Sequence, residues 1–238
     1  MDFSQDRYSR MISNPIQTYW GLIASRHDPD AFAVLDAAYR ESQRGYHDWS
    51  HIGDLLAKLD YFKALAVRPD LIAAAIFWHD VVYVTRDSEG LLRSDAENVR
   101  ASAALFESHA KFNETDAAAI HDLIMATADH LDARATIERY PGFANDLDLF
   151  LDLDLSSLGA PWPAFEQNLE RLRFEYAWVP EPLFCLGRLQ MIDTFAARGD
   201  ALYRRDETRK LWNKRAHENL ARAQEELRRE VARLASSA

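Results

Sequence analysis

Residues 71–78 restrict the fold more than any other stretch, because all of them are apolar. Pro69 comes just before this stretch, and proline is favoured in the first turn of a helix. A helix that is apolar on every side has to lie inside the protein, with other elements packed around it. The sequence therefore predicts a core helix over residues 70–81, with His79 and Asp80 at its end, deep in the protein.

Most of the remaining chain has the period of an α-helix. A stripe at i, i+3, i+4 and i+7 spacing predicts a helix that starts near Ile52; its members are Ile52, Leu55, Leu56, Leu59 and Phe62. Asp30 can cap one further helix, and Asn113 with Asp116 resembles a capping pair for another. Other helices are expected over residues 30–42, 94–110, 144–158, 164–176 and 182–198. Because neither a repeat nor a pair of strands is evident, the fold is predicted to be all-α.

Composition and charge narrow the class of protein. With 238 residues, 48% of them hydrophobic, the chain can bury the core of a single domain over residues 1–238. This domain would have a core over about residues 15–198 and a long charged helix over about residues 200–235. A net charge of -10 with scattered basic residues argues against a nucleic-acid duplex or an anionic membrane as partner. The single cysteine, Cys185, and the absence of a signal-peptide pattern predict a cytoplasmic protein.

Histidines and an aspartate suggest a metal site. His47 and His51 are four residues apart, and His79 is directly followed by Asp80 at the end of the core helix. Imidazole and carboxylate ligands together suit Mn, Fe, Co, Ni and Zn ions. Such a site can activate water when some coordination positions stay open.

The segment over residues 144–158 offers a further ligand. Read as a helix, it has one face formed by Leu147, Phe150, Leu151, Leu155 and Leu158. Asp154 falls within that face, whereas Asp152 projects from nearly the opposite side. A carboxylate among leucines is costly unless it is paired, hydrogen-bonded or bound to a metal. Asp154 is therefore predicted to be a ligand, and Asp152 a solvated surface acid.

The order His51, His79-Asp80, Asp154 resembles the H…HD…D pattern of the HD-domain superfamily of metal-dependent phosphohydrolases. The Tyr46-to-His51 segment and the Asp-Leu-Ser context of Asp154 are also similar to the cyclic-nucleotide phosphodiesterase branch. More closely, the chain resembles a bacterial family of predicted HD-superfamily phosphohydrolases over about residues 15–225. The stretches that carry this resemblance are Gly45-Tyr46-His47, Phe77-Trp78-His79-Asp80, Ala126-Thr127-Ala128-Asp129-His130, Phe150-Leu151-Asp152-Leu153-Asp154, Arg173-Phe174-Glu175-Tyr176 and Gly187-Arg188.

The resemblance implies an HD-domain helical bundle and hydrolysis of a phosphate ester. One divalent ion (Mn, Fe, Co, Ni, Zn or Mg) would be held by His51, His79, Asp80 and Asp154. Asp80 can also bridge to a second ion. In the phosphodiesterase branch the first histidine protonates the leaving group, which would make His47 the acid. His130, Arg44 and Arg188 are candidates for contact with a second metal or with phosphate, and His109 is a weaker one.

Departures from better-known relatives leave the substrate open. The alarmone hydrolases carry a Glu-Asp pair soon after the HD motif, where this chain continues Val81-Val82. The motif Gly-Tyr-Pro of the cyclic-dinucleotide enzymes is not present, and neither is the glutamine context with which the phosphodiesterases clamp a nucleotide. The expected partner is thus a small phosphorylated substrate, a nucleotide or another metabolite, cleaved as a monoester or a diester.

Two rival functions stay open at this point. Some HD-domain proteins hold two irons and oxidise small substrates, and histidines such as His109 and His130 are what such a site would recruit. The second rival is a non-catalytic module that binds a metal or a nucleotide. The apolar stripe of the C-terminal helix can also serve a homodimer; it comprises Trp212, Ala216, Leu220, Ala223, Leu227 and Val231.

Overall fold

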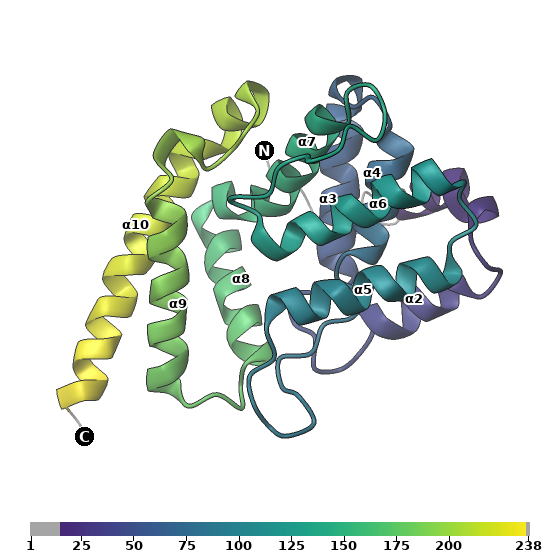
Figure 1. The fold of residues 1–238 in the computed structure, drawn as a ribbon. Helices are drawn as coiled ribbons and strands as arrows, with labels where there is room; N and C mark the ends of the chain where they lie inside the picture. Colours follow the sequence, from purple (N-terminus) through teal and green to yellow (C-terminus); the bar gives the residue numbers. More distant parts are fainter. Residues whose placement is uncertain (1–14, 237–238) are drawn as a thin grey trace. The chain divides into compact units, whose positions relative to one another are not determined.

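The computed structural model describes residues 15–236, and this part of the chain is helical (Figure 1). No β-strand occurs among residues 15–236; the only pairings of that kind are isolated bridges, between His27 and Ala110 and between Arg86 and Leu92. The all-α prediction is confirmed. None of the helices in the described part of the chain is both long and apolar enough to cross a membrane.

The chain divides into two compact units, Met1–Leu153 and Asp154–Ala238. A division into compact units does not show whether the units fold as one domain. The expectation of one domain over residues 1–238 therefore stays a prediction. Within the described residues of the first unit, residues 15–23 are helical. Its other α-helices are α2 (Ala31–Tyr39), α3 (Trp49–Phe62), α4 (Pro69–Trp78), α5 (Asp95–His109), α6 (Glu114–Ala126) and α7 (Phe143–Asp154), the last of which ends one residue into the second unit.

Helix α4 is the core helix of the first unit. It packs against α3, α5 and α6, and every residue from Leu71 to Trp78 is fully buried. The helix ends three residues earlier than expected, since His79 is its C-terminal cap and its backbone N–H still bonds the Ala75 carbonyl at 2.8 Å. The sequence prediction of a buried helix that delivers His79 and Asp80 to the core is thereby confirmed for His79, which is 1% exposed.

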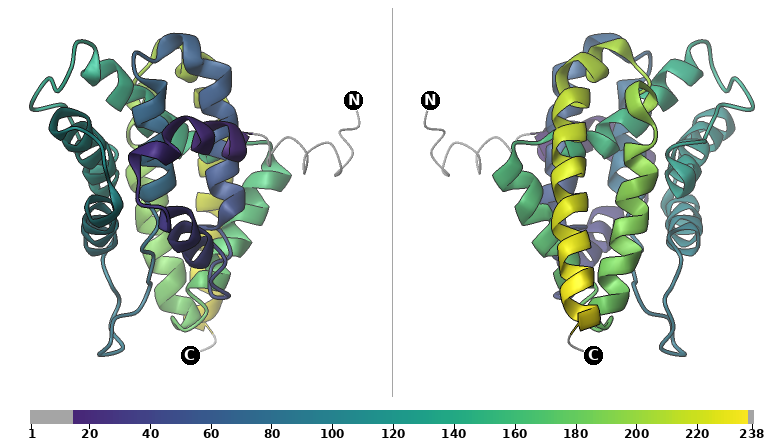
Figure 2. Two further views of the ribbon diagram at one scale, coloured as in Figure 1. Left: turned by 90° about the vertical axis from the view of Figure 1, so that its right-hand side faces the viewer. Right: turned by 90° about the vertical axis from the view of Figure 1, so that its left-hand side faces the viewer.

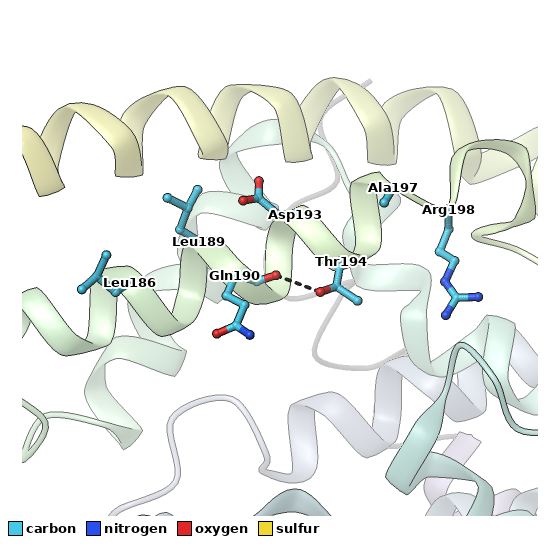
Figure 3. A pocket seen from close by; sticks show the side chains of 7 residues that line it. All are labelled: Leu186, Leu189, Gln190, Asp193, Thr194, Ala197 and Arg198. Carbon is cyan, nitrogen blue, oxygen red and sulfur yellow. Dashed lines mark hydrogen bonds between the residues drawn. The ribbon is translucent and has the colours of Figure 1, made fainter.

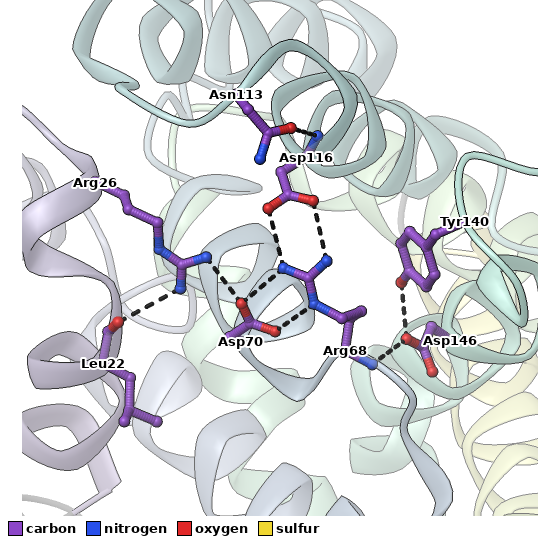
Figure 4. Close-up of polar contacts among 8 residues, drawn as sticks. All are labelled: Leu22, Arg26, Arg68, Asp70, Asn113, Asp116, Tyr140 and Asp146. Atoms are coloured by element: carbon purple, nitrogen blue, oxygen red, sulfur yellow. Dashed lines mark hydrogen bonds and ion pairs between the residues drawn. The ribbon is translucent and has the colours of Figure 1, made fainter.

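A network of ion pairs fixes the start of α4 (Figure 4). The Arg68 guanidinium donates two hydrogen bonds of 3.0 Å to the Asp116 carboxylate and also bonds Asp70. Arg26 donates to the Asp70 Oδ2 at 2.8 Å, the oxygen that the Arg68 Nη2 also bonds. Burial alone would raise the pKa of Asp70, but these two arginines lower it below its usual value. The first turns of α4 and α6 are thus joined, and the Asn113 side chain caps α6 by accepting from the Asp116 N–H, as the sequence predicted.

Asp146 on α7 caps α4 from a distance (Figure 4). Its carboxylate is fully buried and accepts from the backbone N–H groups of Val67 at 2.8 Å and Arg68 at 2.7 Å. The Tyr140 hydroxyl donates a third hydrogen bond of 2.7 Å, and burial together with Asp146 raises the pKa of Tyr140 far above its usual value. The first N–H groups of a helix lack partners within the helix, so a buried acceptor beside them stabilises its start.

The second unit consists of α8 (Trp162–Glu175), α9 (Glu181–Ala196) and α10 (Asp206–Ser236), with short 3-10 helices at Leu155–Gly159 and Gly199–Ala201. Helices α9 and α10 lie side by side along their length (Figure 2). Ala216, Leu220 and Ala223 of the expected apolar stripe are buried in this unit. The Asn219 amide, on α10, donates to the Leu158 and Ala160 carbonyls at 2.8 Å. The charged C-terminal helix is therefore confirmed, while a homodimer stays a prediction.

Gly159 packs closely against α10, whereas Gly187 on α9 has open space around it, so the two glycines should respond differently to substitution by alanine. A Cβ at Gly159 would lie 2.6 Å from the Trp212 Cβ and 2.9 Å from its Cα, whereas a Cβ at Gly187 on α9 would meet nothing within 4 Å. We expect Gly159→Ala to lower the free energy of unfolding by about 1–3 kcal/mol, because backbone has to shift. Gly187→Ala should instead raise it by up to about 1 kcal/mol through helix propensity. Urea denaturation of both variants checks the pair, and equal effects would contradict this packing.

Candidate metal centre

Two helices of the first unit place the ligand candidates. His51 lies in the first turn of α3, whose N-terminus is capped by Asp48 through a 2.7 Å hydrogen bond from the Ser50 N–H. His79 caps the C-terminus of α4, and Asp80 follows it. His51 is 7% exposed and His79 is 1% exposed, so both imidazoles are largely removed from water.

One carboxylate oxygen faces both imidazoles. The Asp80 Oδ2 lies 2.9 Å from the His79 Nε2 and 3.5 Å from the His51 Nε2. The other ring nitrogen of His79, Nδ1, lies 2.9 Å from the Ile76 carbonyl. A carbonyl only accepts, so Nδ1 carries a proton, and Nε2 is the ring nitrogen that faces Asp80. The His79 Nε2, the His51 Nε2 and the Asp80 Oδ2 thus face one another, as the ligands of one metal ion could.

The donor set fits a divalent metal. Ligand atoms of His51, His79 and Asp80 all lie within 4.8 Å of one another. Burial alone would raise the pKa of the Asp80 carboxyl, but the charges of His79 and His47 and hydrogen bonds from His51 and His79 hold it well below its usual range. An ionised carboxylate with two imidazoles is a nitrogen and oxygen set that suits Zn, Fe, Co, Ni and Mn. These three residues can hold a metal ion.

Arg44 supports the turn that carries Asp80. Its side chain is 2% exposed and donates to the carbonyls of Asp80 at 2.7 Å, Val81 at 2.8 Å and His47 at 3.2 Å. Its Nε donates to Glu41 at 2.9 Å. Four of the five guanidinium N–H groups are thereby used inside the protein. These four hydrogen bonds favour a positioning role for Arg44 over the phosphate contact expected from the sequence. The sequence alone could not show that backbone carbonyls would meet this side chain.

His47 lies beside the ligand set. It precedes the Asp48 cap of α3, and its ring centroid is 6.0 Å from that of His51. The ring stacks on Tyr83 at a centroid distance of 3.6 Å and an interplanar angle of 21°. The stacking fixes the ring plane, and the imidazole stays half-buried rather than enclosed. His47 therefore lies next to a candidate ligand without belonging to the possible metal-binding group.

The remaining site residues expected from the sequence lie on elements of the fold other than α3 and α4. His130 comes directly after the short helix Thr127–Asp129 and is half-buried, and neither of the two possible metal-binding groups found among residues 15–236 includes it. His109 belongs to the second group, with Asp28 and Asp30. Asp154 is the last residue of α7 and is half-buried. Arg188 lies on α9, where its Nη1 is 3.7 Å from the Met191 sulfur. The functional roles of His130, Asp154 and Arg188 stay predictions.

One assignment from the sequence is wrong. Asp152 was expected to be a solvated surface acid, but it is only 1% exposed. Helix α7 is buried on more than one face, because Leu149, Leu153 and Asp152 are covered as well as the predicted leucine face. Helical period tells which residues share a face, and it does not tell how many faces other elements cover.

A hollow in the second unit lies along one face of α9 (Figure 3). Its charged side chains are Asp193 and Arg198, and the others include Leu186, Leu189 and Thr194. Asp193 already accepts hydrogen bonds from Gln224 at 2.6 Å and Arg228 at 3.1 Å. None of its lining residues is a histidine or cysteine, and both possible metal-binding groups found among residues 15–236 lie in the first unit.

Comparison with known proteins gives no relative from which a role could be transferred. No family model, no curated protein and no solved structure matches the chain. The chemistry of the site therefore rests on its own residues.

Proposed function

We propose that this chain is a metal-dependent phosphohydrolase of HD type that cleaves a phosphate ester of a small molecule, with nucleotides as the first candidates. The observation that carries the proposal is the convergence of two imidazole Nε2 atoms on the Asp80 Oδ2, at 2.9 and 3.5 Å. The order of His51, His79, Asp80 and Asp154 along the chain, which resembles the HD pattern, supports it.

A divalent ion bound there supplies Lewis acidity, which lowers the pKa of water and polarises a phosphoryl oxygen. The protein residues orient the groups around it. The Ile76 carbonyl accepts from the His79 Nδ1, which leaves Nε2 as the ring nitrogen that can bind the ion. Arg44 holds the backbone at Asp80 by donating to the carbonyls of Asp80 and Val81. Partners of this kind keep ligand geometry and basicity constant. The sequence adds Asp154 as the predicted fourth ligand, which metal content in Asp154→Asn will test.

His47 is proposed to handle the proton of the leaving group. When water attacks phosphorus, the ester P–O bond breaks and the leaving oxygen takes up a proton. His47 lies beside His51 and is held against Tyr83, so its imidazole can donate that proton without being a ligand. Histidine is suited to this task because its unperturbed pKa lies near neutral pH.

We expect His47→Gln to lower kcat by about 10²- to 10⁴-fold on alkyl phosphate esters, because general acid catalysis contributes about this much. The loss should be much smaller on p-nitrophenyl phosphate, whose leaving group needs no proton. Metal content should stay as in the parent protein, as measured by elemental analysis. Equal losses on both kinds of ester would remove His47 from the role of acid.

The proposal is tested on the full chain. Metal is removed with a chelator, and the protein is reloaded separately with Mn, Fe, Co, Ni, Zn or Mg. Phosphate release is then screened across linear and cyclic nucleotides and sugar phosphates. Turnover of at least one ester only in the metal-loaded protein is expected. No turnover with any of these metals would overturn the proposal, and two bound irons with oxygen consumption would assign the chain to the oxygenase class instead.

A further inference from the structure

A second group of ligand-type side chains lies in the first unit, away from the residues of the metal centre. Asp28 and Asp30 come just before and at the start of α2, and His109 is the last residue of α5. The His109 Nδ1 is 3.6 Å from the Asp30 Oδ1 and 4.0 Å from the Asp28 Oδ2. Ligand atoms of all three lie within 4.8 Å of one another, and the group shares no residue with His51, His79 and Asp80.

Backbone and ring contacts hold this group in place. The Asp28 N–H donates to the His109 carbonyl at 2.9 Å, next to the bridge between His27 and Ala110. The His109 ring stacks on Trp78 at a centroid distance of 5.7 Å and an angle of 19°. These contacts hold the Asp28 backbone and the His109 ring in place, and ligands that are already held lose little freedom when they bind an ion.

The His109 Nδ1 is buried and has no hydrogen-bond partner in the described structure. Its distances of 3.6 and 4.0 Å to the carboxylate oxygens are too long for hydrogen bonds. They suit a shared ion, since two ligands that are each about 2.1 Å from a metal lie roughly 3 to 4 Å apart. A buried polar nitrogen without a partner is costly, and a cation in this position would supply one.

Two carboxylates and one imidazole face one another at the group, and in the described part of the chain a lysine occupies only one of the four carboxylate oxygens. Lys111 bonds the Asp28 Oδ1 at 2.7 Å, which leaves the Asp28 Oδ2 as the oxygen that faces His109. The Asp30 side chain is 70% exposed, so water can complete the coordination from that side.

We propose that Asp28, Asp30 and His109 form a second, separate site for a divalent transition-metal ion such as Zn²⁺. The imidazole nitrogen favours this class over Mg²⁺ and Ca²⁺, which prefer oxygen ligands. An ion there ties the start of α2 to the end of α5. We call this group of Asp28, Asp30 and His109 the peripheral site, and the group of His51, His79 and Asp80 the first centre. His109 stacks on Trp78, the residue directly before His79, so an ion at the peripheral site would support the helix end that carries the first centre.

The test counts Zn²⁺ ions bound by the metal-free full chain, by isothermal titration and elemental analysis. We expect two equivalents in the parent, and the loss of one in Asp30→Asn, in His109→Gln and in Asp80→Asn. The combined variant Asp30→Asn with Asp80→Asn should bind neither. In the Asp80→Asn protein Zn²⁺ should still raise the melting temperature, and it should not do so once Asp30→Asn is added.

Glu114→Gln is the matched control, because Glu114 is an exposed carboxylate in the first turn of α6. It should keep both equivalents. Circular dichroism of each variant checks that a lost equivalent does not reflect unfolding. If the Asp30→Asn and His109→Gln variants each still bind two Zn²⁺ ions, the proposed site at Asp28, Asp30 and His109 is overturned. It is also overturned if the parent protein binds only one Zn²⁺ ion and Asp80→Asn abolishes that binding. If only Asp80→Asn leaves the count unchanged, the first centre fails and the peripheral site stands.

Discussion

Asp80→Asn is expected to lose the metal ion of the first centre and to lower phosphate-ester turnover on the order of 10³-fold, because the ion contributes several kcal/mol of charge stabilisation. Asparagine has nearly the same shape but no negative charge. The two Nε2 atoms that face the Asp80 Oδ2 would then meet a neutral amide. Elemental analysis and kcat, measured on the same preparation, check the prediction.

Asp95→Asn is the control for this experiment, because Asp95 is an exposed acid in the first turn of α5. It should keep the metal and the activity of the parent. Removing the metal from the parent with a chelator should reproduce the loss seen in Asp80→Asn. Full activity of Asp80→Asn without bound metal would rule out the proposed role of this carboxylate.

The second large effect is expected at Asp146, which acts on stability rather than chemistry. Asp146→Ala removes a fully buried carboxylate and leaves the Val67 and Arg68 N–H groups and the Tyr140 hydroxyl without their acceptor. We expect the free energy of unfolding to fall by about 3–5 kcal/mol, because each buried donor left unsatisfied costs about 1–3 kcal/mol. Urea denaturation followed by circular dichroism measures the change.

Tyr140→Phe provides the comparison, since it removes one of the three donors and keeps the ring. Its cost should be about 1 kcal/mol, the net value of a single hydrogen bond. If Asp146→Ala were no more costly than Tyr140→Phe, the hydrogen bonds of 2.8 and 2.7 Å from the Val67 and Arg68 N–H groups would contribute little to stability.

The candidate metal centre was partly predictable because His79 and Asp80 follow the most regular part of the sequence. The apolar run that ends at Trp78 predicts a buried helix, and His79 follows that run directly. The grouping of His51 with His79 and Asp80 agrees with the predicted ligand set. The role of Asp154 stays a prediction from helical phase and resemblance.

Other features of the site were not predictable, for reasons that can be named. The phase of α7 suggested that Asp152 faces water, but packing covers that side of the helix too. Arg44 looked like a phosphate ligand because of its position beside His47, yet its guanidinium bonds carbonyls 36 and 37 residues away. Whether an arginine meets substrate or backbone depends on what the fold brings to it.

The sequence by itself determined the helical class, the burial of α4 and the delivery of His79 to the core, because these follow from apolar period and local capping. Only the tertiary structure decided that Asp146 accepts from backbone N–H groups 79 and 78 residues earlier in the chain, at the start of α4. It alone brought Asp28 and Asp30 to His109. Contacts of this kind join residues with no periodic relation in the sequence, so their distances are set by how the helices pack and not by the spacing of the residues along the chain.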